Sequence, residues 1–307
     1  MTICYNTINK QCRQANFSAN GDTMLVNMKG VLADAAKGGY AIGGFNFASL
    51  ESGLGAVRAS EELGVPFVLE HAPAHEEYCP FEVAAPIMVQ LAKAAKTQVV
   101  AHLDHGDSVE LCLKALRLGF SSVMFDGSAL PYEENIRQTA LVCKVAHEFG
   151  ATVEAELGAM PHNLKGELRE YTPEDFYTRP DEAARFVAET GVDALAISFG
   201  TVHGVYKAEP RLAFGVIDEV RKATGDLPLV MHGGSGLCDA DYRQAISRGI
   251  RKVNYYTYGA IAAGEAVREY VADHAGKLMF HDIAVCATDA VCADVKRVMR
   301  ILNPEVS

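Results

Sequence analysis

Short apolar runs alternate with stretches of helical periodicity along most of the chain. After Met24, the segment LVNMKGVLADAAKGG predicts an amphipathic helix that ends at Gly38 and Gly39. Stretches such as LESGLGAVRASEELG predict further helices between the apolar runs. Eight runs predict β-strands: YAIGGFNF (40–47), PFVLEHA (66–72), QVVAHLD (98–104), SSVMFDG (121–127), TVEAEL (152–157), ALAISFG (194–200), LPLVMHG (227–233) and RKVNYY (251–256).

This order of elements predicts an α/β fold, a (β/α)₈ TIM barrel. The runs are continuously apolar, as in parallel strands that are buried on both faces, and eight strand–helix units suit a closed barrel. The alternative is a doubly wound open sheet, but its usual GxGxxG turn does not match GGFNFASLESG. We therefore predict one barrel domain over residues 24–307, with C-terminal helices in AIAAGEAVREYVADHA and DAVCADVKRVMRIL.

Two segments do not fit the repeat. Residues 1–23 are polar and aperiodic, which predicts a poorly ordered N-terminal extension. The stretch from Gly158 to Pro180 is too long and polar for an ordinary barrel connection, and such loops often form lids or parts of sites.

Composition narrows the range of partners. The formal net charge of −11 over 307 residues argues against non-specific electrostatic binding of nucleic acid. Eight cysteines without a CxxC pair indicate free thiols of a cytosolic protein. The N-terminus lacks the apolar core of a signal peptide, and no apolar run is long enough to span a bilayer. We expect a cytoplasmic protein with neither a nucleic-acid nor a membrane partner.

Polar side chains gather where the predicted strands end. The C-terminal ends of all barrel strands meet at one mouth. His105, His203 and His232 come from units three, six and seven, and each precedes a glycine. A single such histidine is more often a packing residue, as we expect for His102, but three equivalent ones beside carboxylates predict a Zn²⁺ site. The other polar residues at these ends are Asn46, Asp104, Asp126, Glu154, Glu156 and Asn254.

The last two strands lead into a second candidate site. MHGGSG follows strand seven and VNYYT lies at the end of strand eight. Barrels often hold phosphate in these two loops through backbone N–H groups and a helix N-terminus. A glycine-rich turn without a ligand is the alternative, and the position in the barrel order favours phosphate. The residues concerned are Gly233, Gly234, Ser235, Asn254 and Thr257.

Seven segments together resemble the class II, metal-dependent ketose-bisphosphate aldolase family, which includes fructose- and tagatose-1,6-bisphosphate aldolases. They are LVNMKGVLADAAKGGYAIGGFN, AHLDHGDS, GFSSVMFDGS with PYEEN, VEAELG, GTVHGVYK, LPLVMHGGSG and GIRKVN. The resemblance implies that His105, His203 and His232 hold a divalent metal, usually Zn²⁺, and that Asp104 is the general acid/base. It places Glu156 and Asp126 near the metal. The residues that match the family's positions around the substrate and its phosphate are Gly204, Lys207, Gly233, Ser235, Asn254 and Thr257. We also expect Asn46 and Gly234 to contact the substrate, and a monovalent cation to bind near the phosphate.

The chain also departs from the family pattern. Glu167 in the loop after strand five is the nearest counterpart of the glutamate that protonates the substrate carbon, although the GG-x-ED pattern is missing. Ala72 replaces a serine near the end of strand two, and Tyr256 stands where fructose- and tagatose-specific members have aspartate or alanine. The arginine pattern for a second phosphate is missing from the tail.

The resemblance implies an aldehyde-lyase of carbohydrate metabolism, such as glycolysis, that releases dihydroxyacetone phosphate from a ketose phosphate and forms a homodimer or homotetramer. The departures keep open the use of the same metal site on a different or unphosphorylated ketose, by an aldolase or a retro-aldol epimerase. A non-catalytic scaffold is the third hypothesis, but intact buried charged residues argue against it because they cost stability.

Overall fold

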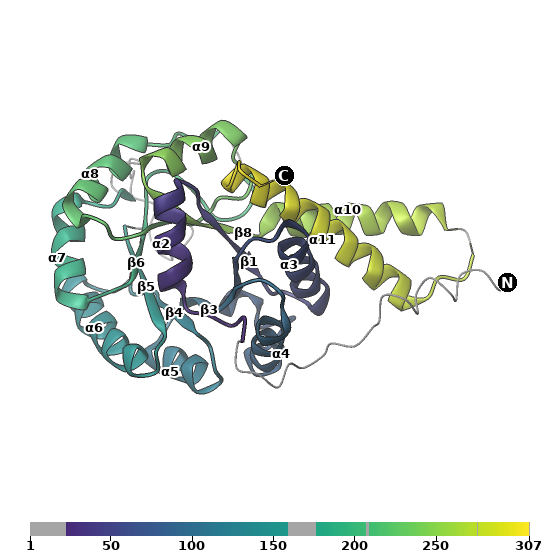
Figure 1. The fold of residues 1–307 in the computed structure, drawn as a ribbon, viewed down its shortest axis with the longest axis horizontal. Coiled ribbons are helices and arrows are strands. Elements are labelled where there is room, and N and C mark those ends of the chain that lie inside the picture. Colours follow the sequence, from purple (N-terminus) through teal and green to yellow (C-terminus); the bar gives the residue numbers. More distant parts are fainter. Residues whose placement is uncertain (1–22, 159–175, 207–208, 275, 307) are drawn as a thin grey trace, which may run out of the picture.

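The eight predicted strands form a closed parallel barrel in the computed structural model, which describes residues 23–158, 176–206, 209–274 and 276–306 (Figure 1). The strands follow one another around the barrel, and β1 closes it by pairing with β8. The predicted TIM barrel is confirmed. The strands are β1 (Ile42–Asn46), β2 (Phe67–His71), β3 (Val99–Gly106), β4 (Ser122–Phe125), β5 (Thr152–Leu157), β6 (Ala194–Ile197), β7 (Leu229–Met231) and β8 (Ile250–Tyr255).

Helices cover the outside of the barrel and pack on its outward-facing side chains. Ser49 and Ser108 cap two of these helices by accepting backbone N–H bonds, as expected at helix starts. A short 3₁₀ turn, η1 (Pro73–His75), follows β2. The outer helices are α3 (Leu50–Leu63), α4 (Phe81–Ala94), α5 (Val109–Arg117), α6 (Tyr132–Glu148), α7 (Pro180–Thr190), α8 (Phe214–Thr224) and α9 (Asp239–Arg248).

Helix α2 (Met28–Gly38) closes the barrel at the end where the strands begin. It starts later than predicted: Leu25 forms an isolated bridge with Val99, and Asn27 caps the helix by accepting the Lys29 N–H at 3.1 Å. Its buried side chains pack against the first inward residues of the strands, which leaves the opposite mouth free for a site. These inward residues include Ile42, Val68, Val100, Ala196 and Val230.

Strand alternation turns the barrel interior from apolar to polar. Because successive strand side chains point to opposite faces, residues two apart share the interior. Val100 is followed inside the barrel by His102 and then Asp104, all three buried. Lys252 and Asn254 follow the same rule on β8. The interior therefore changes from aliphatic at α2 to charged at the C-terminal mouth.

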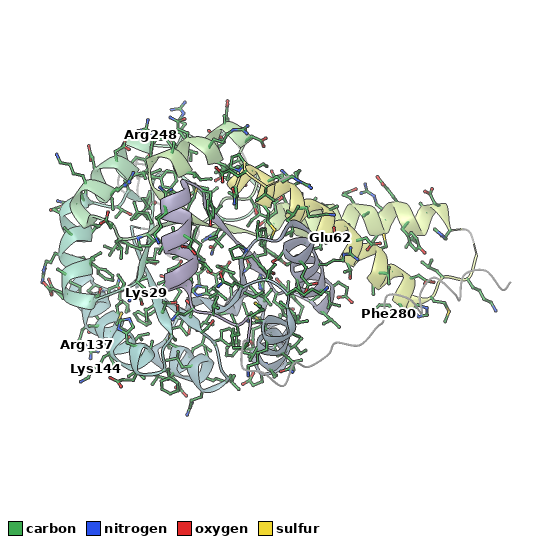
Figure 2. The ribbon with its side chains drawn as sticks, in the orientation of Figure 1. Lys29, Glu62, Arg137, Lys144, Arg248 and Phe280 are labelled. Carbon is green, nitrogen blue, oxygen red and sulfur yellow. The ribbon has the colours of Figure 1, made fainter. Side chains whose placement is uncertain are left out.

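The C-terminal helices α10 (Thr257–Asp273) and α11 (Phe280–Leu302) pack on each other and form an arm that extends from the barrel (Figure 1). The middle of α11 packs on α3, where Gly55 permits the close approach of Val291. Phe280, at the far end of the arm, is 81% exposed (Figure 2). The prediction of C-terminal helices is confirmed, although α11 starts earlier than predicted.

Candidate active site

A cavity of about 730 Å³ opens at the C-terminal mouth of the barrel. Most of the predicted site residues line it, and they come from the ends of β1, β3 and β8 and from the loops after β4, β6, β7 and β8. Of the predicted residues, the lining includes Asn46, Asp104, His105, Asp126, His203, Gly204, Gly233, Ser235, Asn254 and Thr257. Glu167 and Lys207 lie outside the described residues, and so does most of the long loop after β5.

The three predicted histidines meet at this mouth. Ring centroids of His105 and His232 are 4.6 Å apart, and those of His105 and His203 are 5.0 Å apart. One nitrogen from each ring lies within 4.8 Å of the others, close enough to ligate one ion. Among the described side chains, His105 Nε2 and His232 Nδ1 are buried without a hydrogen-bond partner. Buried orphan nitrogens of this kind fit a metal ion.

Local backbone geometry aims His105 at the cavity. The register between β3 and β4 shifts between Leu103 and Gly106, and His105 has a φ of 49°. A non-glycine residue in this region is strained, and such strain concentrates at functional sites. A Cβ added at Gly106 would lie only 2.5 Å from the Met124 carbonyl oxygen, which explains the glycine after the histidine. The bulge therefore re-aims the side chain at the strand end.

Carboxylates hold the imidazoles in place. The Nε2–H of His232 donates to Glu154 Oε1 at 2.8 Å, and its Nδ1 lies 3.4 Å from Glu156 Oε2. His105 Nδ1 donates to Asp126 Oδ2 at 2.8 Å. Carboxylate partners of this type fix the tautomer and orientation of metal-binding histidines. Glu156 and Asp126 thus lie beside the histidine cluster.

The charge pattern favours a cation at this point. Burial alone would lower the pKa of His105, but the charge of Asp104 and the bond to Asp126 raise it to about 9. Burial would likewise lower the pKa of His232, but its hydrogen bond to Glu154 and the nearby carboxylate of Glu156 raise it. The surrounding carboxylates therefore stabilise positive charge among the imidazoles, as a divalent ion requires.

Asp104 is held by two amides. The side-chain NH₂ of Asn46 donates to Oδ2, and that of Asn254 donates to Oδ1, each at 3.0 Å. Burial opposes ionisation, yet the positive groups around it, His105 first, keep the pKa of Asp104 well below its usual range. The carboxylate is therefore ionised, fixed in orientation and exposed to the cavity, as a general base must be.

Lys252 organises the floor of the site, and the sequence analysis did not single it out. Its fully buried ammonium lies 2.7 Å from Glu70 Oε1 and 2.9 Å from Glu154 Oε2, and it donates to Asn254 Oδ1 at 2.8 Å. One cation thereby orients the amide that holds Asp104 and the carboxylate that holds His232. The signal was present as charged residues inside otherwise apolar strands, VLEH and RKVN.

The predicted phosphate loops border the same cavity. Gly233 has a φ of 64°, and a Cβ there would collide with the Val202 carbonyl, so only glycine fits. Ser235 Oγ accepts the Tyr256 N–H at 2.9 Å, and α10 begins at the cavity with Thr257. A helix N-terminus is a ready anion site. Gly234 does not line the cavity, because its N–H donates to the Asn254 carbonyl beneath it.

The wall of the cavity that adjoins these loops is aromatic. The ring centroids of His75 and Tyr256 are 4.6 Å apart, and the Tyr78 and Tyr256 hydroxyls are 3.4 Å apart. Burial lowers the pKa of His75 to about 4, so this imidazole is neutral. Ala72 lies in the same wall. His71 turns away and pairs its Nε2 with the Cys79 carbonyl at 2.7 Å.

The fold and the site define an enzyme barrel with an imidazole and carboxylate cluster at its catalytic mouth. The family model "Fructose-bisphosphate aldolase class-II" matches residues 26–305. This chain therefore belongs to the class II fructose-bisphosphate aldolase family, and it is an aldehyde-lyase. The resemblance found in the sequence is confirmed.

Individual relatives agree with this family. A Bacillus subtilis (strain 168) protein named "Probable fructose-bisphosphate aldolase" is 41% identical over 251 residues, which cover 81% of this chain and 87% of the relative. The fructose-bisphosphate aldolase of Staphylococcus aureus (strain N315) is 40% identical over 249 residues, or 80% and 85% of the two chains. The crystal structure of the YdjI aldolase from Escherichia coli K12 superposes with a TM-score of 0.80 at 34% identity, covering 91% and 97%.

Within the described part of the chain, no helix combines the length and the apolar character needed to cross a membrane.

Proposed function

We propose that the enzyme cleaves a ketose phosphate reversibly into dihydroxyacetone phosphate and an aldehyde, with a divalent cation such as Zn²⁺ held by His105, His203 and His232. The observation that carries this proposal is the convergence of these three imidazoles beside Asp104 at one barrel mouth. A bound divalent ion would supply Lewis-acid stabilisation of the negative charge that develops on the ketose oxygens.

The protein's own groups account for the proton transfer at the scissile bond. Asp104 is ionised and is held by two amides, so it accepts the proton of the hydroxyl on the departing aldehyde half. The side-chain NH₂ of Asn254 donates to Asp104 Oδ1, and the Lys252 ammonium donates to the amide oxygen of Asn254. The base therefore keeps one orientation during the reaction, which favours transfer over a short distance.

The phosphate of the three-carbon half fits the loops after β7 and β8. Gly233, Ser235 and Thr257 lie together on that side of the cavity, at the N-terminus of α10. Backbone N–H groups there favour an anion. Glu167 and Lys207 keep their predicted roles, as proton donor to the substrate carbon and as phosphate contact, and a monovalent cation beside the phosphate also remains a prediction.

Ala72 and Tyr256 in the cavity wall favour a second candidate, the same metal site acting on another ketose or on an unphosphorylated one. Turnover with fructose bisphosphate, tagatose bisphosphate and unphosphorylated ketoses separates the two. The exposed apolar residues of the arm, Met279, Phe280 and Val285, support the predicted homodimer or homotetramer.

The test is a half-reaction that needs no knowledge of the aldehyde. Metal-loaded protein is incubated with dihydroxyacetone phosphate in D₂O, and proton NMR follows the loss of one hydroxymethyl proton. We expect exchange that stops when a chelator is added and falls at least ~10³-fold in His105→Asn, since the ion supplies the main charge stabilisation. Metal analysis of each sample is the control. No exchange by protein that carries metal contradicts the proposed donor.

A further inference from the structure

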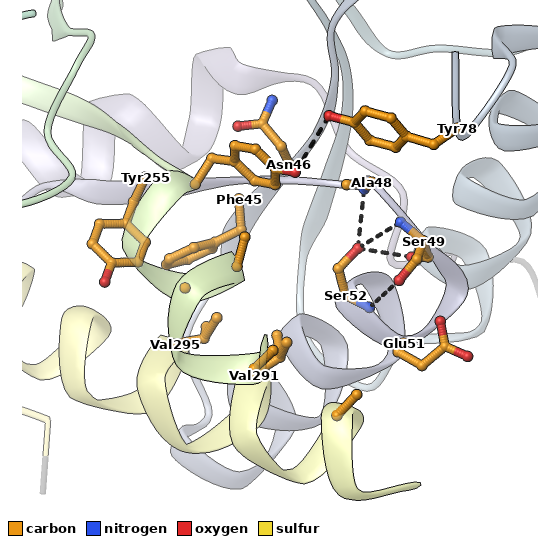
Figure 3. A pocket seen from close by; sticks show the side chains of 15 residues that line it. Phe45, Asn46, Ala48, Ser49, Glu51, Ser52, Tyr78, Tyr255, Val291 and Val295 are labelled. Atoms are coloured by element: carbon orange, nitrogen blue, oxygen red, sulfur yellow. Dashed lines mark hydrogen bonds between the residues drawn. The ribbon is translucent and has the colours of Figure 1, made fainter. Parts of the chain in front are cut away.

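A second cavity of about 270 Å³ lies between the ends of β1 and β8 and the helices α3, α10 and α11; we call it the annex. Its floor is apolar, with Phe45 from the barrel and Val291 and Val295 from α11. Figure 3 shows these valines across the space from Tyr78. Small residues on the arm keep the space open: Gly259, Ala260, Ala263 and Ala287.

The annex adjoins the active-site cavity. Asn46, Tyr78, Tyr255 and Tyr256 line both spaces. Asn46 is also the residue whose amide donates to Asp104 at 3.0 Å. A substrate with its reacting hydroxyl at Asp104 therefore has the annex next to it, beyond Asn46 and between β1 and the first turns of α10.

The chemistry of the annex selects what enters it. Among its lining residues, Glu51 alone carries a charge, in the first turn of α3, and a carboxylate repels a second phosphate. Ser49 and Ser52 offer hydroxyls, but the Ser49 hydroxyl accepts the Ser52 N–H, and the Ser52 hydroxyl accepts the Ser49 N–H and donates to the Ser49 carbonyl (Figure 3). What remains for a ligand is an apolar floor with a weakly polar rim.

We propose that the annex binds the distal chain of an uncharged aldehyde longer than a triose, so that the enzyme prefers such aldehydes as partners of dihydroxyacetone phosphate. This inference rests on the proposed function. In this arrangement the carbon chain of the aldehyde runs along Tyr78 and Tyr256, and the small side chain of Ala260 leaves room for it in the annex. The favourable contribution is the removal of methylene groups from water.

The test compares propanal with hexanal in condensation with dihydroxyacetone phosphate. For the wild type we expect a KM for hexanal about tenfold below that for propanal, because more apolar surface is buried. Ala260 is exposed and lines the annex, so Ala260→Leu places a larger side chain in that space. It should raise the KM for hexanal about tenfold and leave propanal unchanged. The matched control is Ala262→Leu, on the same helix at a residue that does not line the annex, and it should change neither value.

Deuterium exchange of dihydroxyacetone phosphate is measured on all three proteins. Equal exchange shows that the donor half of the site is intact, so a change confined to hexanal supports the annex. Equal KM values for the two aldehydes in the wild type, or an Ala260→Leu effect that is the same for both, overturns the inference while the aldolase function stands. Absence of exchange in the metal-loaded wild type overturns the proposed function and the aldehyde assignment with it.

Discussion

The two sides of the barrel mouth are built on opposite principles. On the metal side, at the ends of β3 to β7, charged groups pair in fixed geometry, as His105 does with Asp126 and His232 with Glu154. On the aldehyde side, formed by the segment after β2 and by Tyr256 before α10, neutral rings face the cavity, and the Tyr78 and Tyr256 hydroxyls only approach each other at 3.4 Å. Charge placement suits bond breaking, whereas ring surfaces suit the choice of an aldehyde.

Asp104 stands between the two sides and gives the largest predicted effect. Asp104→Ala should lower kcat for ketose cleavage by about 10²–10⁴-fold, the usual contribution of a placed base. Metal content should stay at the wild-type level, because the three imidazoles are untouched. Deuterium exchange of dihydroxyacetone phosphate should fall much less, because Asp104 works on the aldehyde half. Equal losses in cleavage and exchange would place Asp104 on the metal side instead.

The metal side could be predicted from the sequence for a physical reason. A buried strand that ends in DHG or MHG is costly unless something binds the polar groups, and the barrel order then brings such ends together. The aldehyde side could not be predicted from the sequence, because Tyr78, Tyr256 and Val291 line one space only through the packing of the turn after η1, the start of α10 and α11. Lys252 was missed for a similar reason: its partners Glu70 and Glu154 come from β2 and β5, and strand order alone does not give that register.

Glu70 provides a pH test of the floor that the two sides share. Burial raises its pKa from 4.5 to about 8, despite Lys252, since Asp104 and Glu154 are also close. Between these values the folded protein holds a proton that the unfolded chain has lost. Stability therefore falls as pH rises through this window, by up to about 1.4 kcal/mol per pH unit.

Glu70→Gln should remove this slope. Urea unfolding of both proteins with excess chelator, at about pH 5 and about pH 7.5, measures it. We expect the variant to gain relative to the wild type as the pH rises, by roughly 1–3 kcal/mol over this range. The chelator keeps metal binding from contributing. If the two proteins change in parallel, Glu70 is ionised in the folded state and Lys252 neutralises both carboxylates.

The smallest effect is expected on the aldehyde side, for Tyr256→Phe. The hydroxyl contact with Tyr78 is at the weak end of hydrogen bonding, while the ring keeps its packing on His75. KM for hexanal and for dihydroxyacetone phosphate should each change less than about threefold, with kcat retained. Tyr78→Phe, which removes the other hydroxyl of the same contact, is the matched comparison and should behave alike. A large rise in the KM for dihydroxyacetone phosphate in Tyr256→Phe alone would mean that this hydroxyl contacts the donor phosphate. Tyr256 would then belong with Ser235 and Thr257, and the aldehyde side would be defined by η1 and the annex without it.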